Sequence, residues 1–163
     1  MMNNSNQNSY SNYDTRGPAQ NRNTGFNRQP PVMPADLLDG TKEYDPVEAG
    51  RKFVDAVDKR SFTTSQLRQI LSSAAIVKNR IDRENAASDL LRTDIKQEIQ
   101  YLKLKLIYQM GRDNGLKRAF SGENGINLPA VLQNVGDSKE NFNRFYRLLE
   151  SIVAYRKFAG GDS

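Results

Sequence analysis

The sequence contains no cysteine and no histidine among its 163 residues. A thiol nucleophile, a serine–histidine pair, an imidazole base and the usual zinc ligand sets are therefore excluded, so acid–base chemistry would depend on Asp, Glu, Lys or Tyr. Without cysteine there are no disulfides, which fits a reducing compartment. Residues 1–13 are polar throughout, so they form neither a signal peptide nor a membrane span. We expect a soluble, cytoplasmic protein that makes no membrane contact.

Motifs for catalysis and for nucleotide binding are also missing. No GxxxxGK[ST] or GxGxxG motif follows a strand pattern, so a nucleotide fold has no support. Asp82 and Glu84 lie beside basic residues, which favours ordinary ion pairing over catalysis. Asp94 and Glu98 lie four residues apart but have lysine neighbours, so we expect no metal there and interpret Asp94 as a helix cap. The sequence predicts no enzyme, no catalytic residue, no metal and no cofactor.

Positive charge is in excess, with a formal net charge of +5. Residues 1–45 hold four Lys/Arg and five Asp/Glu, whereas the rest of the chain holds twenty and fourteen. A basic folded part behind a near-neutral segment points to an anionic partner such as nucleic acid. A solvated surface with a mild basic excess explains the same numbers.

The chain divides into two parts at about residue 44. Residues 1–44 are rich in Asn and Gln in their first three-quarters and have few aliphatic side chains, which predicts a disordered tail. Its scattered arginines and aromatic residues suit weak contact with an RNA strand, although a plain flexible extension is the simpler interpretation. Residues 45–163 carry the helical periodicity and form one domain.

The apolar spacing in residues 45–163 predicts an all-α bundle of about five helices. We expect helices over residues 46–60, from about 64 to 84, 94–114, 128–135 and 139–159, with a short helical turn at 116–120. No stretch alternates apolar and polar residues over strand length, so strands are not expected.

The stretch 101–113, YLKLKLIYQMGRD, combines the strongest apolar run with a dense basic flank. Five residues at helical spacing predict one buried face: Ile95, Ile99, Leu102, Leu106 and Met110. A second row lies to one side of it: Tyr101, Leu104 and Tyr108. Burial of both rows would make this the central helix of the bundle.

Cations recur on the polar faces of three of the expected helices. We predict that they form a groove that follows RNA phosphates without reading sequence, although solvated faces are the alternative. The predicted RNA-binding residues are Arg68, Lys78 and Arg80, then Lys103, Lys105 and Arg112, and then Arg144, Arg147, Arg156 and Lys157.

Three blocks resemble a known family when they are taken together, in this order and at this spacing. They are FTTSQLRQIL at 62–71, YLKLKLIYQMGR at 101–112 and NRFYRLLESIVAYRKFAGG at 143–161. Together they are similar to the small helical subunit of the type III-A CRISPR effector, the Csm complex. The resemblance covers most of residues 46–161, whereas the Asn-rich extension and the loop at 122–125 depart from it.

The resemblance implies a compact five-helix protein without an active site. Copies would stack along the inner side of a ribonucleoprotein, contact guide RNA, target RNA and other Csm subunits, and serve antiviral defence, while other subunits cut nucleic acid. It also implies RNA-facing or subunit-facing roles for Gln66, Arg68, Arg112, Arg156 and Lys157. The alternative is a helical adaptor that binds only protein; an enzyme is the third possibility.

Overall fold

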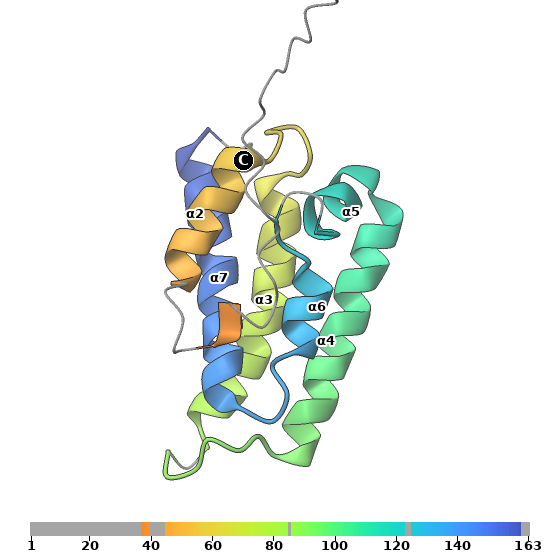
Figure 1. Ribbon diagram of the computed structural model, residues 1–163. Helices are drawn as coiled ribbons and strands as arrows, with labels where there is room; N and C mark the ends of the chain where they lie inside the picture. The colour runs from red at the N-terminus through yellow and green to blue at the C-terminus, as the bar shows by residue number, and fades with distance from the viewer. Residues whose placement is uncertain (1–36, 40–44, 85, 123–124, 161–163) are drawn as a thin grey trace, which may run out of the picture.

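A computed structural model describes residues 37–39, 45–84, 86–122 and 125–160. Within these residues the chain forms helices and no strand, apart from two isolated bridges, Leu90 with Ser138 and Ser121 with Asn127. The predicted all-α fold is confirmed (Figure 1). The named helices are α2 (Pro46–Ala56), α3 (Thr64–Asp82), α4 (Thr93–Arg112), α5 (Asn114–Phe120), α6 (Leu128–Gln133) and α7 (Lys139–Phe158).

Side-chain caps set the starts of most helices. The Asp45 carboxylate accepts from the Val47 N–H at 2.8 Å, and Pro46 occupies the first turn of α2, where a missing N–H costs nothing. At α3 the Thr63 hydroxyl accepts from the Gln66 N–H at 3.2 Å, while the Gln66 side-chain oxygen accepts from the Thr63 N–H at 2.8 Å. This reciprocal capping box places the start of α3 at Thr64, which agrees with the range predicted from the apolar spacing.

The predicted cap of α4 is wrong. Asp94 lies inside the first turn, and the residue at the cap position, Arg92, makes no side-chain cap hydrogen bond. The Asp94 carboxylate instead accepts from Arg80 at 2.7 Å and from Arg92 at 3.1 Å. An acid in the first turn still favours the helix dipole, and here it also connects α4 to α3.

The core lies between α7 and the helices around it. Helix α7 packs against α2 and α3, and α4 packs against α3, α5 and α6. The five predicted inward residues of α4 are all buried, from Ile95 to Met110. Burial of such a row is what holds an amphipathic helix in place, because apolar area removed from water contributes about 25 cal/mol per Å².

The second row of α4 is not buried, which corrects the prediction. Tyr101, Leu104 and Tyr108 are 60%, 59% and 64% exposed. Helix α4 lies at one side of the bundle rather than in its centre, so only one face meets neighbouring helices (Figure 1). Apolar spacing shows which residues share a face, but the number of neighbours decides how much of the helix is covered.

Two glycines allow segments to approach closely. A Cβ at Gly50 of α2 would lie 2.7 Å from the Cβ of Ser151 in α7, whose hydroxyl donates to the Val47 carbonyl at 2.6 Å. A Cβ at Gly115 of α5 would collide with the carbonyl oxygen of Ser61. The lack of a side chain at these positions therefore brings α2 against α7, and α5 against the segment before α3.

The core also includes two leucines that the sequence assigns to the tail. Leu37 and Leu38 are buried, and Arg144 of α7 donates to the Leu38 carbonyl at 3.3 Å. The boundary at residue 44 is therefore too late for this short segment. The rest of the predicted tail, residues 1–36 and 40–44, lies outside the described residues. None of the described helices is long and apolar enough to span a bilayer.

Candidate nucleic-acid interface

The predicted cations differ sharply in their surroundings. Four residues of the predicted set are used within the fold. Lys78 pairs with Asp82 one turn later, and Lys103 of α4 donates to the side chain of Gln133, the last residue of α6. Arg80 binds both Asp94 and Glu98 of α4, and Arg144 pairs with Glu140 at 3.5 Å. Such partly exposed pairs each contribute little to stability, but they reduce the charge available to a ligand.

Arg156 is a buried cation, with a side chain only 3% exposed. Its guanidinium lies 5.7 Å from the Phe62 ring centroid and donates to the Phe62 carbonyl at 3.3 Å and to the Lys59 carbonyl. It therefore connects the end of α7 to the segment between α2 and α3, and it offers no charge at the surface. A signal for this was present in the sequence, because Arg156 continues the helical spacing of the buried residues Leu149 and Ile152, whereas Lys157 lies about 100° away around the helix.

Gln66 also has a structural place. Besides closing the capping box, its amide donates to the Asp113 carboxylate at 2.7 Å. Asp113 caps α5 through the Leu116 N–H at 2.8 Å. The Leu116 hydrogen bond and then the Gln66 hydrogen bond lower the pKa of Asp113, because both favour its charged form. The start of α3 is thus fixed to the junction of α4 and α5.

Contacts between aromatic residues complete this end of the bundle. The ring of Phe53 in α2 lies 6.1 Å from that of Phe62 and 5.0 Å from that of Phe120 in α5. Together with the Arg156 and Gln66 contacts, this cluster brings the end of α2, the start of α3, α5 and the ends of α4 and α7 to one end of the molecule (Figure 1).

Exposed cations gather at that same end, which we call the cationic end. Three predicted residues belong to it, one from each predicted helix: Arg68 of α3, Arg112 of α4 and Lys157 of α7. Three others are not in the predicted set because they lie outside the long helices: Lys59, Arg60 and Lys117. Among the described residues, none of these six takes part in an ion pair. Arg147 and Lys105 are exposed elsewhere on α7 and α4.

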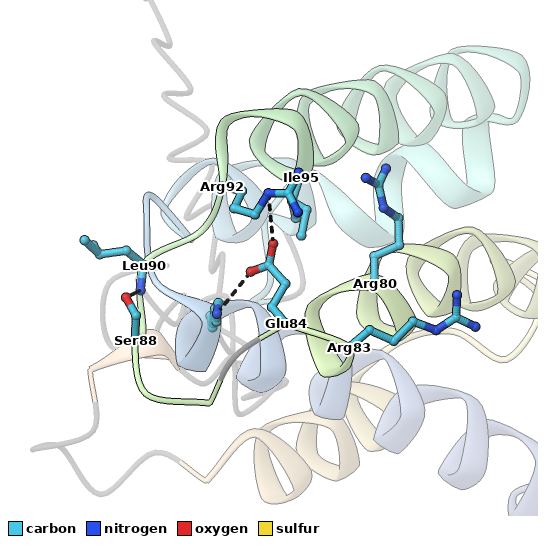
Figure 2. A pocket seen from close by; sticks show the side chains of 8 residues that line it. Arg80, Arg83, Glu84, Ser88, Leu90, Arg92 and Ile95 are labelled. Carbon is cyan, nitrogen blue, oxygen red and sulfur yellow. Dashed lines mark hydrogen bonds and ion pairs between the residues drawn. The ribbon is translucent and has the colours of Figure 1, made fainter.

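The opposite end of the bundle is also charged, but most of its cations are paired with carboxylates. A pocket of about 580 Å³ there is lined by four cations and one acid, and Figure 2 shows the acid, Glu84, between two of them. Lys139 lies 3.0 Å and Arg92 3.5 Å from the Glu84 carboxylate, while Arg80 is paired with α4. Glu84 therefore occupies the position that an anion would need, so the ion-pairing interpretation of this acid is confirmed.

No group of acidic side chains within the described residues could hold a metal ion. The fold and the cationic end define a small all-α protein with a positively charged surface at one end of its bundle. A family model described as Csm2 Type III-A matches residues 42–162, and the chain belongs to this family. The resemblance of the three sequence blocks is thus confirmed, and the matched range leaves out the Asn-rich extension.

Curated relatives agree with the family model. The chain is similar to the "CRISPR system Cms protein Csm2" of Mycobacterium tuberculosis, with 32% identity over 59% of this chain and 73% of the relative. It is 34% identical to the protein of the same name from Streptococcus thermophilus, over 61% of this chain and 74% of the relative. As a member of this family, the chain is a small, non-catalytic subunit of a type III-A CRISPR complex.

Proposed function

We propose that this subunit contacts the phosphate backbone of the guide RNA and its target through the cationic end, while it stacks with other subunits and further copies of itself in the effector. The observation that carries this proposal is the asymmetry of charge pairing along the bundle. Exposed cations from α3, α4 and α7 lie at one end without an ion pair among the described residues, whereas three of the four cations that line the pocket at the opposite end are paired with carboxylates, Arg83 being the exception.

Physical chemistry favours a polyanion as the ligand of such an end. Each cation is a point contact that neutralises one phosphate and releases condensed counterions, so RNA affinity should fall steeply as salt rises. The cations come from separate segments held together by the Phe53 cluster, the Gln66–Asp113 hydrogen bond and Arg156. They are therefore presented at fixed separations, which suits a regular backbone and carries no base specificity.

The test is a salt series with the full chain. Fluorescence anisotropy measures the affinity for single-stranded RNA and for a guide–target duplex between about 50 and 200 mM salt, for wild type and for the double variant Arg68→Ala/Arg112→Ala. The slope of log affinity against log salt should become shallower by up to about two in the variant, because each lost phosphate contact removes about one. Circular dichroism and the melting temperature should stay near wild type, since both side chains are exposed.

A matched control removes the same charge at the other end of the molecule. In Lys78→Ala/Lys96→Ala, both cations are paired with acids in the wild type, so the salt slope should stay unchanged. Binding that does not respond to salt, or an equal loss in both double variants, would refute the cationic end as the phosphate surface. In that case the alternative, a helical adaptor that contacts only protein, would be the better description.

A further inference from the structure

The outer face of α4 exposes two tyrosines and a leucine opposite the buried row. Tyr101, Leu104 and Tyr108 lie three or four residues apart and are all about 60% exposed. No acidic residue occurs between Ile99 and Arg112. The packing of this chain does not account for an exposed aromatic row that is accompanied by Lys103, Lys105 and Arg112, and such a face is a candidate for an interaction surface.

A cation accompanies each tyrosine in the same geometry. The Lys105 ammonium lies 4.9 Å from the centroid of the Tyr101 ring, and the Arg112 guanidinium carbon lies 5.7 Å from that of Tyr108. In both pairs the cation follows the tyrosine by one helical turn. The tyrosine–cation unit therefore repeats after seven residues, about 10.5 Å along the helix axis.

We propose that this face of α4 binds bases of single-stranded RNA, with Tyr101 and Tyr108 stacking two bases while Lys105 and Arg112 contact the neighbouring phosphates. The inference rests on the proposed function and deepens it, because Arg112 belongs to the cationic end as well as to this face. A strand held at the cationic end can thus continue along α4 without crossing an acidic side chain.

Three features favour bases over a protein partner. Tyrosine rings interleaved with Lys and Arg are the pattern that binds single strands without sequence preference, since every base has a face to stack. The absence of acid suits a polyanion along the whole face. The repeat of about 10.5 Å exceeds the spacing of about 3.4 Å between adjacent nucleotides in a helical strand, so the rings bind separated, unstacked bases.

The experiment compares RNA with and without bases. Anisotropy with the full chain at low salt uses two probes, an unstructured single-stranded RNA and an abasic ribose–phosphate oligomer of the same length. In Tyr101→Leu/Tyr108→Leu, affinity for the base-containing RNA should fall at least about 25-fold, because stacking contributes a factor of about 5 to 150 per base and two stacked bases are lost. Affinity for the abasic oligomer and the salt slope should not change, since the cations are retained.

Two matched variants control for the ring and for apolar surface. Tyr101→Phe/Tyr108→Phe keeps both rings and should bind within about twofold of wild type. Ile76→Ala removes a side chain of α3 that is similarly exposed, at 62%, and should have no effect on either probe. Sedimentation analysis of the same proteins reports self-association, and circular dichroism reports folding.

Different outcomes separate this inference from the proposed function. Equal losses for the two probes, or unchanged RNA affinity in the leucine variant, would overturn base stacking. A leucine variant that loses self-association but binds RNA as wild type would also overturn it, by identifying α4 as a protein interface. In those cases the proposed function still holds if the RNA affinity of the wild type falls with salt and the Arg68→Ala/Arg112→Ala variant binds RNA more weakly. Wild-type binding without salt dependence would refute both.

Discussion

Replacement by alanine should affect different properties at two adjacent cations of α7: the stability of the fold at Arg156 and RNA binding at Lys157. Arg156 is buried and donates to the carbonyls of Phe62 and Lys59, whereas Lys157 is exposed. Hydrogen bonds from a charged donor contribute about 1.5–3 kcal/mol each, and Arg156→Ala also leaves two carbonyl oxygens without this partner. The cost of burying the guanidinium charge offsets part of the stability that these hydrogen bonds contribute, because the Nε and Nη1 atoms have no hydrogen-bond partner among the described residues. We expect a net loss of about 2–4 kcal/mol.

Urea unfolding followed by circular dichroism measures this difference. With a slope of about 2 kcal/mol per molar urea, a loss of 3 kcal/mol lowers the midpoint by about 1.5 M. Lys157→Ala should change the unfolding free energy by no more than about 0.5 kcal/mol, which is about 0.25 M in the midpoint, and should instead make the salt dependence of RNA binding shallower by about one. If Arg156→Ala unfolded at the wild-type midpoint, the structural role assigned to its guanidinium would be refuted.

Three further predictions concern packing and acid stability. Gly50→Ala should lower the unfolding free energy by about 1–3 kcal/mol, because the new Cβ meets Ser151, whereas Gly111→Ala should raise it by up to about 1 kcal/mol, because its Cβ would have no neighbour within 4 Å. Thermal unfolding of both variants checks the opposite signs; two shifts of the same sign would contradict the close approach of α2 and α7. Asp113 has a lowered pKa in the folded state, so the unfolded state binds its proton at higher pH, and stability from this group is lost as pH falls below about 4. Asp113→Asn keeps a capping oxygen and should unfold in urea with a weaker pH dependence between pH 5 and 3; an unchanged dependence would remove Asp113 as its source. Leu106→Ala should cost about 2–5 kcal/mol in chemical denaturation, since this side chain is 2% exposed; a loss below 1 kcal/mol would show that the core there collapses around the cavity.

Most of the helices could be predicted from the sequence because their signals are local. The Asp45–Pro46 pair, the Thr63–Gln66 capping box and Ser138 each mark a helix start within a few residues of chain. The buried row of α4 follows from its spacing alone. The ends were less exact: α2 ends at Ala56 rather than near residue 60, because Val57 leaves the helical conformation.

The sequence by itself determined the fold class, the positive charge of the folded part and the three blocks that the family match confirms, because these depend on composition, periodicity and order along the chain. Only the tertiary structure decided which cations are available. Arg68 and Arg80 both lie on the polar face of α3, yet Arg80 binds Asp94 and Glu98 of α4, while Arg68 is exposed and has no ion pair among the described residues. The exposure of Tyr101 and Tyr108 was also a tertiary outcome, because it depends on where neighbouring helices lie, and helical spacing contains no information about that.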